Sequence, residues 1–385
     1  MKKVWSPAFG RPSPHTCLTA LFAAAILTAT SLAQLPEQPE QTTLKTTKVS
    51  LESDGRALSS VLEDLSNQAG IRLSVDNTMA NTSVSIRASE RPFWETFMAA
   101  LYPTNKDGTF AFQVDDGSSY SGTRYTGKTY VSGPFLVLAN RVVHQADYRR
   151  AEGDAELFYV EMQVLVDPAL RGMFVEGNNL PTKAVDDAGT SLVLEKSPGP
   201  RIVPIGPSRP GPDRAAPARV LLARPAKPAQ LGRKLASLQG DIAVTIADDI
   251  EKVELTVPGK TEATIAGIKC QFETKVSSNG GVEISSHFDR PDSMSDDDWN
   301  AADQRLFCTR QRVYDAAGKA WPPSGGAGAS YGVKVRSMSE SFTRSRPGFG
   351  RGGADAGEAA KAVVEVIKSV KVVKVPYRFG DLVLP

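Results

Sequence analysis

Two histidines, His144 and His287, lie beyond the first 33 residues, so histidine chemistry has few possible sites. His287-Phe288-Asp289 ends a run of alternating polar and apolar residues, and residues two apart on a strand share one face. A histidine beside a carboxylate can act as a general base. A hydrolase also needs a nucleophile, and no Gly-x-Ser-x-Gly elbow marks one here. Zinc binding and Ser/His/Asp catalysis are therefore both disfavoured.

A stretch of acids offers the second candidate chemistry. Calcium is bound by carboxylates, but a calcium loop alternates its ligands around a central glycine, which this stretch lacks. Ser295 followed by three acids instead predicts the start of a short helix through Asp303, because serine caps a first turn and acids there favour the helix dipole. The acids are Asp292, Asp296, Asp297 and Asp298.

Gly348 to Gly353 matches the Gly-x-Gly-x-x-Gly pattern of dinucleotide-binding loops. Such a loop follows an apolar strand and opens a helix. Ser345-Arg346-Pro347 precedes this one, and the helical-looking run Ala359 to Ser369 begins too late. The formal charge of +2 gives no sign of a nucleic-acid partner either. We therefore predict no catalytic residue, no metal, no cofactor and no nucleic-acid partner.

Cys270 and Cys308 are the cysteines beyond the N-terminal segment, and both lie in strand-like runs. A disulfide between them would stabilise the fold by about 4 kcal/mol in the chain-entropy model. The alternative is two buried free thiols. Neither cysteine has the paired spacing or the histidine neighbours of a metal site.

The N-terminus predicts export. Lys2, Lys3 and Arg11 precede the uncharged run Thr16 to Ala33, which ends in the small-x-small pattern Ser31-Leu32-Ala33. This order is typical of a signal peptide, here cleaved after Ala33, and the alternative is an uncleaved membrane anchor. No later apolar run reaches the ~18 residues of a membrane span. We expect a periplasmic or secreted protein with no transmembrane span after cleavage, in a compartment where disulfides persist.

Residues 47–140 predict a small α/β domain with the order strand, helix, strand, strand, helix, strand, strand. The first helix is indicated by the apolar stripe from Leu58 to Ala69, followed by Gly70 as its cap. The second is indicated by Ser89 as cap and Pro92 in its first turn. Alternating residues predict strands at Lys48–Glu52, Ile71–Val75, Ser83–Arg87, Phe110–Val114 and Phe135–Leu138.

The run from Val49 to Leu101 resembles the STN domain, the short N-terminal domain of secretins and TonB-dependent receptors. The resemblance rests on Leu58-x-x-Val61-Leu62-x-x-Leu65-x-x-x-Ala69-Gly70-Ile71, on Val75-Asp76 and on Trp94-x-x-Phe97-Met98-x-x-Leu101. It implies an interaction module without catalytic residues, whose partner would be an envelope or periplasmic protein. The stretch Asp115 to Gly133 departs from the family. It is longer than a hairpin loop needs, and its Tyr120, Tyr125 and Tyr130 suit an adaptable contact surface.

Residues 155–385 predict a second domain, an antiparallel β-sandwich, because short alternating runs are separated by turn signals such as Asn279-Gly280. Nine prolines between 197 and 230 predict an insertion outside the packed core. Ser341 to Gly357 is a second, Gly/Arg-rich insertion, and Val372 to Phe379 predicts a closing edge strand. Other strands are expected at Leu157–Val166, Leu235–Ile246, Val253–Val257, Ile265–Val276, Gly281–Phe288, Leu306–Val313, Tyr331–Val335 and Val370–Val375.

Two segments of this domain are similar to each other, 185–192 and 313–321. Each has a strand that enters an Asp-containing turn with a glycine and leaves it with an apolar residue. Either the domain has two similar halves, or two common hairpins coincide. The region after 155 also resembles envelope proteins of unassigned function that pair an STN-like domain with a sandwich. The cues are the turns at 186–189 and 315–319 and the ending at 375–385, and they imply architecture only.

The sequence is interpreted as an exported α+β protein, with a small βαββαββ STN-like domain followed by an antiparallel β-sandwich with Pro-rich and Gly/Arg-rich flexible insertions. We expect a non-enzymatic interaction or adapter protein of the cell envelope, whose STN-like domain binds a protein partner. The alternative is a carbohydrate-binding or carbohydrate-cleaving sandwich. In that case exposed aromatics would line one groove with two acids, and the candidates are Trp299, Tyr314, Trp321 and Tyr331.

Overall fold

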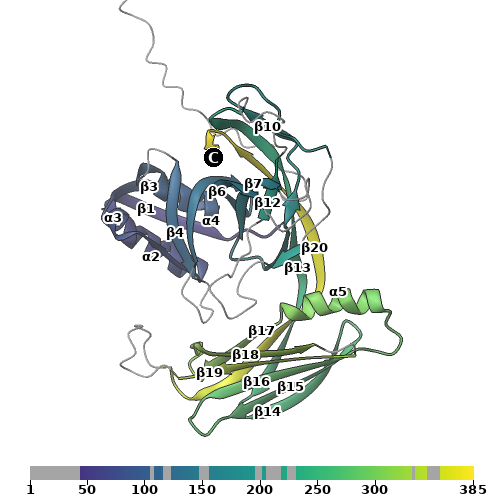
Figure 1. The fold of residues 1–385 in the computed structure, drawn as a ribbon. Coiled ribbons are helices and arrows are strands. Elements are labelled where there is room, and N and C mark those ends of the chain that lie inside the picture. The colour runs from purple at the N-terminus through teal and green to yellow at the C-terminus, as the bar shows by residue number, and fades with distance from the viewer. Residues whose placement is uncertain are drawn as a thin grey trace, which may run out of the picture. The chain divides into compact units, whose positions relative to one another are not determined.

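The computed structural model describes residues 44–104, 108–115, 123–146, 156–195, 202–204, 218–222, 231–331, 334–344 and 356–385. The predicted signal peptide, Tyr120 and the Gly348 to Gly353 motif lie outside these residues. The described chain is a β-rich α+β fold (Figure 1). None of its helices is long and apolar enough to span a bilayer.

The first part of the chain forms an α/β module in which two helices pack together beneath a two-stranded sheet. The elements follow the predicted succession except that the structure has one more strand, β5, a short helix, α3, and a 3₁₀ turn. The left-handed Gly70 ends the first helix as expected (φ 67°). The elements are β1 (Lys48–Ala57), α2 (Leu58–Ala69), β2 (Arg72–Val75), α3 (Asn77–Ala80), β3 (Ser83–Pro92), α4 (Phe93–Leu101), a 3₁₀ turn (Tyr102–Thr104), β4 (Thr109–Asp115), β5 (Thr123–Ser132) and β6 (Phe135–Ala146).

The added strand is β5, which occupies most of the predicted tyrosine-rich loop and pairs with both β4 and β6. Tyr130 is buried, and its ring centroid lies 6.2 Å from that of Phe379. The ring of Tyr125 lies 5.6 Å from that of Phe112. The prediction of an adaptable contact surface is therefore wrong for these two tyrosines, because both rings pack against core residues.

The sheet of β2, β4, β5 and β6 continues into residues predicted to begin the second domain. β7 (Glu156–Val166) pairs along β6, and β12 (Ala218–Leu221) and β9 (Asn178–Asn179) follow it. Backbone hydrogen bonds thus cross the predicted boundary between 140 and 155.

The Pro-rich segment contributes two strands, β11 (Ile202–Pro204) and β12. Val203 and Val220 are buried in the adjacent core, so the prediction that this whole segment lies outside the core is wrong. Pro204 fits because β11 is an edge strand, where a missing N–H costs no ladder bond.

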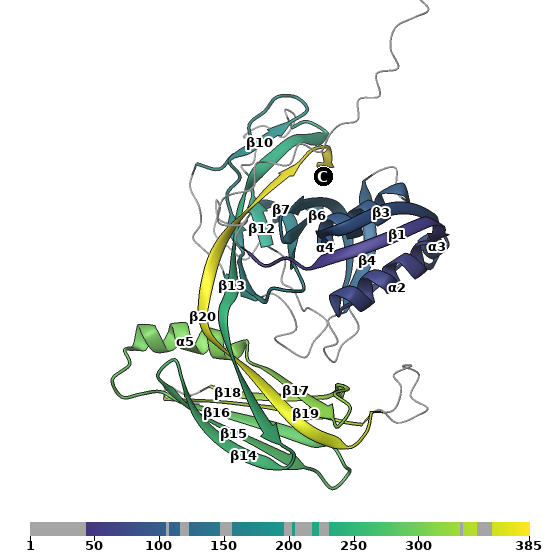
Figure 2. The same ribbon diagram turned by 180° about the vertical axis from the view of Figure 1, so that it is seen from behind.

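Two long strands, β13 (Lys234–Thr256) and β20 (Ala359–Phe379), pair antiparallel and run side by side in both views (Figures 1 and 2). β13 spans the two predicted strands Leu235–Ile246 and Val253–Val257. β20 includes Ala359 to Ser369, whose sequence looked helical. Pairing is irregular at Asp249, where the Nζ of Lys368 lies 2.8 Å from a carboxylate oxygen of that residue. Over Val372 to Phe379, β20 has β13 on one side and no described strand on the other, as the edge-strand prediction requires.

The β13/β20 pair contributes to two hydrophobic cores. The start of β13 and the end of β20 pack with β6, β7 and β12, which we call the first half. The end of β13 and the start of β20 pack with the sheet β14-β15-β16-β19-β18 and with α5, which we call the second half. The remaining elements are β8 (Gly172–Glu176), β10 (Lys183–Asp186), β14 (Gly259–Ile265), β15 (Ile268–Val276), β16 (Val282–Asp289), α5 (Asp296–Phe307), β17 (Arg310–Asp315), β18 (Pro323–Tyr331), β19 (Val335–Phe342) and β21 (Leu382–Val383).

The similar segments fold into matching turns. In the first half, Asp186 Oδ1 accepts hydrogen bonds from the amides of Ala188 (3.0 Å) and Thr190 (2.7 Å). Its Oδ2 accepts one from the amide of Gly232 (2.7 Å), two residues before β13 begins. Burial alone would raise the pKa of Asp186, but these amide donors outweigh burial and lower it.

The second half repeats every one of these bonds. Asp315 Oδ1 accepts from the amides of Ala317 (3.0 Å) and Lys319 (2.8 Å), and Oδ2 accepts from Gly357 (2.7 Å), two residues before β20 begins. The amide of Gly357 contributes most to lowering the pKa of Asp315. The pairing skips one residue of the long strand in each half, Ala236 of β13 opposite β10 and Ala360 of β20 opposite β17. The structure therefore favours two similar halves over a coincidence of hairpins.

Candidate functional site

The aromatic groove expected of a carbohydrate site is not formed by the tryptophans. Trp299 and Trp321 are buried in the core of the second half. The indole N–H of Trp321 donates to the carbonyl of Gly357 (3.1 Å), next to the Asp315 turn. Tyr314 lies beneath Lys361, with the Nζ 6.0 Å from its ring centre, and the side chain of Tyr331 lies outside the described residues. The tryptophans therefore stabilise the fold and cannot stack on a sugar.

Both cysteines are free thiols in the structure, which is the alternative to the predicted disulfide. Cys270 faces the core from β15. Cys308 caps the C-terminus of α5, so the strand predicted over Leu306–Val313 is a helix end followed by β17. Burial raises the pKa of each thiol to about 11, which leaves little thiolate at neutral pH.

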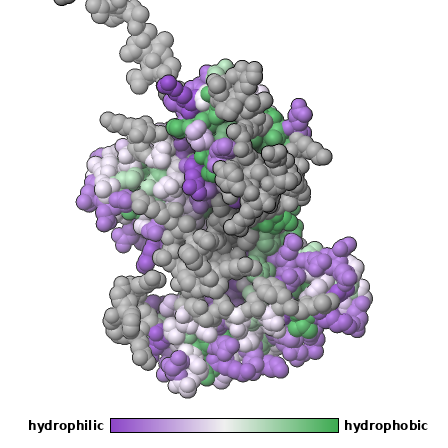
Figure 3. Space-filling model, in the orientation of Figure 1, coloured by the Kyte–Doolittle hydropathy of each residue, from purple (hydrophilic) through white to green (hydrophobic). Residues whose placement is uncertain are grey.

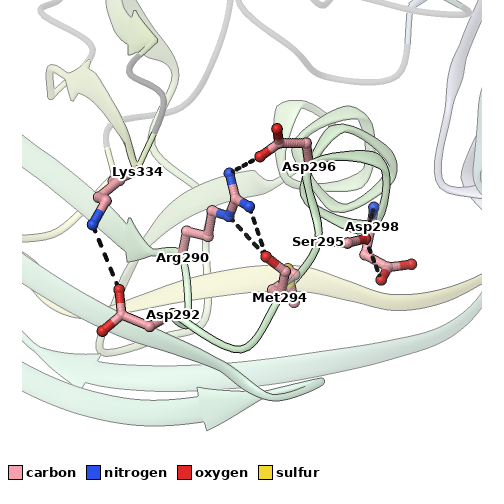
Figure 4. Close-up of polar contacts among 7 residues, drawn as sticks. All are labelled: Arg290, Asp292, Met294, Ser295, Asp296, Asp298 and Lys334. Carbon is pink, nitrogen blue, oxygen red and sulfur yellow. Dashed lines mark hydrogen bonds and ion pairs between the residues drawn. The ribbon is translucent and has the colours of Figure 1, made fainter.

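Ser295 caps α5 as predicted, although the helix continues to Phe307 (Figure 4). The amide of Asp298 donates to Ser295 Oγ at 3.1 Å, and that hydroxyl donates to the Asp298 carboxylate at 2.6 Å. The bond from the Asp298 amide satisfies one of the backbone donors that a helix N-terminus leaves open.

Two of the other acids, Asp292 and Asp296, bind cationic side chains of the chain itself (Figure 4). Arg290 lies 2.6 Å from Asp296 and also donates to the carbonyl of Met294. Lys334 lies 3.5 Å from Asp292. Within the described ranges, no group of three His, Cys, Asp or Glu side chains is arranged to hold a metal. Helix capping and ion pairs therefore account for Asp292, Asp296 and Asp298.

The His287/Asp289 pair anticipated from the sequence is formed, with Nε2 3.1 Å from a carboxylate oxygen of Asp289. The structure adds a third group, because Ser337 Oγ lies 2.8 Å from the Nδ1 of His287. The register of β16 on β19 places His287 directly opposite Ser337. This serine could not be predicted from the sequence, because the two residues are 50 positions apart and no local motif links them.

The core of the second half contains polar groups. Gln311 donates to Ser286 at 2.7 Å, and both residues are buried. Arg336 is 1% exposed, binds Asp303 and lies over the ring of Phe307. Burial raises the pKa of Glu340 to about 7, and the positive charge of Arg310 opposes that shift. These groups face the protein interior and affect stability.

The module presents one regular polar surface, formed by the β1/β3 sheet. α2 and α4 bury their apolar residues beneath this sheet. Its outer face carries the exposed residues Lys48, Ser50, Glu52, Ser85 and Arg87. Among the described strands, β1 and β3 pair only with each other, so each has one edge without a strand partner.

The two edges differ. The side chain of Gln68 in α2 accepts from the amide of Ser50 (2.9 Å) and donates to its carbonyl (2.8 Å). Ser50 is skipped in the pairing with β3, so Gln68 satisfies backbone groups that β3 does not reach. On β3, the exposed residues near the end of the strand include Arg87, Glu90 and Arg91. We call the outer edge of Ser83–Pro92 the β3 edge.

A shallow depression lies on the other sheet of the module, where Ser74, Asp76 and Gln113 are among its lining residues. It is open to solvent and contains no catalytic combination of side chains. The chain was compared with protein-family models, with curated proteins and with solved structures, and none of them matches it.

Proposed function

We propose that the protein is an exported, non-enzymatic adapter of the cell envelope, and that the module within 47–140 binds a protein partner. Three observations support the proposal: the basic, apolar and small-residue order of the N-terminus, the resemblance to STN domains and the element order of the module. Purification of the exported protein tests the first part. Its N-terminus should be Gln34, and a chain that retains residues 1–33 would contradict cleavage.

The observation that carries the binding proposal is the β3 edge. A strand edge presents unpaired N–H and C=O groups, and an added strand from another protein can pair with them. Arg87 and Arg91 favour an acidic segment in the added strand, since opposite charges select partners and speed association. The partner is therefore an envelope protein with an acidic, extended segment.

The edge is preorganised, which lowers the entropy lost on binding. Phe93, at the start of α4, is fully buried and follows directly after Pro92, so the helix anchors the end of β3. The amide of Phe93 donates to the carbonyl of Thr47 (2.9 Å), which fixes the β3–α4 junction to the residue preceding β1. The strand can thus accept a partner without first being ordered.

The test is quantitative capture from a cell-envelope fraction with the full mature chain. Partners bound by the wild type should be lost with the double variant R87E/R91E and retained with Glu63→Lys, a single charge reversal on the exposed face of α2. All three proteins should show the same unfolding temperature. If R87E/R91E captures the same partners as the wild type, the β3 edge is not the interface and the proposal fails.

A further inference from the structure

The second half carries a cluster of three reactive side chains that the adapter function does not use. His287 and Asp289 alternate on β16, and Ser337 lies on the neighbouring β19. The pairing of β16 with β19 is regular from Val282↔Phe342 to Asp289↔Val335, with no bulge. β15 pairs along the other side of β16. The three side chains are thus held by the interior of a sheet, where backbone positions are well fixed.

The hydrogen bonds determine where the protons are. The Asp289 carboxylate can only accept, so the Nε2 of His287, 3.1 Å away, must carry a hydrogen. In the neutral imidazole the other nitrogen, Nδ1, then has a free lone pair. Ser337, 2.8 Å from Nδ1, therefore donates its hydroxyl proton to it. This is the proton arrangement of a serine activated by a general base.

The cluster is accessible to small reagents. The side chains of His287 and Asp289 are 41% and 38% exposed, and Ser337 is partly exposed. Ser339 and Ser341 follow on the same face of β19, opposite Ser285 and Glu283. Ser337 differs from them because an imidazole lies opposite it. These serines therefore serve as internal references for its reactivity.

We propose that Ser337 is an acyl-acceptor site that reacts with small activated esters or thioesters. Its Oγ forms the bond to the acyl carbon while the proton passes from Oγ to the Nδ1 of His287, and Asp289 stabilises the resulting imidazolium. The bond to the leaving group then breaks, and the proton passes from His287 to that alkoxide or thiolate. The product is an ester on Ser337 and the free alcohol or thiol. The site goes beyond the adapter function and does not depend on the β3 edge.

The test uses the full mature chain and p-nitrophenyl acetate, with intact mass and peptide mapping as readouts. We expect one acetyl group on Ser337, formed well before any on Ser339. Ser337→Ala should abolish it, and Ser339→Ala, the matched control, should leave it unchanged. His287→Ala should slow acetylation of Ser337 about 100-fold, the lower range of general-base catalysis. Asp289→Asn should slow it by an intermediate factor without lowering the unfolding temperature, because Asp289 is a positioning residue.

Two results would overturn the proposal. One is acetylation of Ser337 and Ser339 at equal rates in the wild-type chain. The other is a rate in the His287→Ala variant equal to that of the wild type. Unfolding curves of each variant show whether the fold is intact, so a loss of labelling is not mistaken for a loss of structure.

Discussion

The two halves around β13 and β20 share a backbone framework, which contains the same Asp-centred turn, but they differ in the side chains of their cores. In the first half, Val220 on β12 lies opposite Val160 on β7, and both are fully buried. In the second half, β19 pairs with β16 and places Glu340 opposite Ile284. The Asp-centred turns that fix each framework have the same hydrogen bonds. The framework therefore depends on backbone bonding to two aspartates, while the core composition is free to diverge.

The outer faces of the two halves differ as well. In the first half, Leu136 and Leu138 of β6 belong to the core that also contains α2 and α4, so the module covers that sheet. In the second half, the face of β15 and β16 that points away from the core carries polar residues such as Gln271 and His287. In the view of Figure 3, the surface over β14, β15 and β16 is largely hydrophilic. One half supports the module, and the other presents polar side chains to solvent.

Exchanging the residues that distinguish the cores should have the largest effect. Val220→Glu would place a carboxylate in an apolar core without a partner, and we expect it to lower the free energy of unfolding by about 4 kcal/mol or to prevent folding. Val220→Ala is the control for lost volume, and it should lower the free energy of unfolding by about 2 kcal/mol. Urea unfolding of both variants checks this. Equal losses would show that the first half tolerates an acid as well as the second does.

Removal of the ion pair between Arg171 and Glu365 should have the next largest effect on stability. Arg171, which precedes β8 in the first half, lies 3.0 Å from Glu365 on β20 and donates to the carbonyl of Cys308 in the second. The two side chains are 13% and 17% exposed, and burial lowers the pKa of Arg171 to about 10. Arg171→Ala should lower the free energy of unfolding by about 3 kcal/mol, because it leaves the Glu365 carboxylate largely buried without this partner. Lys252→Ala, which removes an exposed partner of Glu365, should cost under about 0.5 kcal/mol in the same urea titration.

Glu340 should make stability depend on pH in the second half. Its pKa is raised from 4.5 to about 7, so the folded state holds this proton more tightly than the unfolded chain does. The free energy of unfolding should therefore fall as pH rises from about 4.5 to 7 and then level off. The loss should be about 3 kcal/mol, because each pKa unit corresponds to about 1.4 kcal/mol. Glu340→Val should remove this slope in unfolding temperatures measured between pH 5 and 8, whereas an unchanged slope would assign it to other groups.

Substitutions in the two Asp-centred turns should have the smallest effects on stability, and the two effects should be similar in size. Both aspartates have lowered pKa values, so their contribution is present above the ordinary value of 3.8 and is lost as pH falls below it. Asp186→Asn and Asp315→Asn should each lower the unfolding temperature at pH 7 and reduce its fall in acid. Melting curves at pH 7 and pH 3 measure both. A large effect at one turn alone would mean that the turns are not equivalent.

Local patterns were sufficient to predict many elements. The stripe from Leu58 to Leu65 gave α2, Ser295 gave the start of α5, and the similarity of the two turns was visible in the residues themselves. β5 was missed because the stretch Asp115 to Gly133 is rich in Ser, Gly and Tyr, a composition typical of loops. A Cβ at Gly127 would lie 2.5 Å from the carbonyl oxygen of Ala139, so this glycine permits the close approach of β5 and β6.

Long-range pairing accounts for what the sequence could not predict. The run from Ala359 to Ser369 has a helix-like spacing, yet Val364 and Val366 are buried between sheets where β-branched residues pack well. The Ser337–His287 contact depends on the register of β19 on β16. That register is set by which faces are buried across the whole sheet, and no window of sequence contains it.

The division of the β13/β20 pair between two cores also implies an order of folding. Every described residue of the core in the second half lies between Val253 and Val366, whereas the core in the first half combines residues up to Ile246 with Val373 to Leu384. Closing the first core requires joining distant parts of the chain, which is entropically costly. Once the second half has folded, it holds the end of β13 beside the start of β20. The second half, though later in the sequence, is therefore expected to fold before the first.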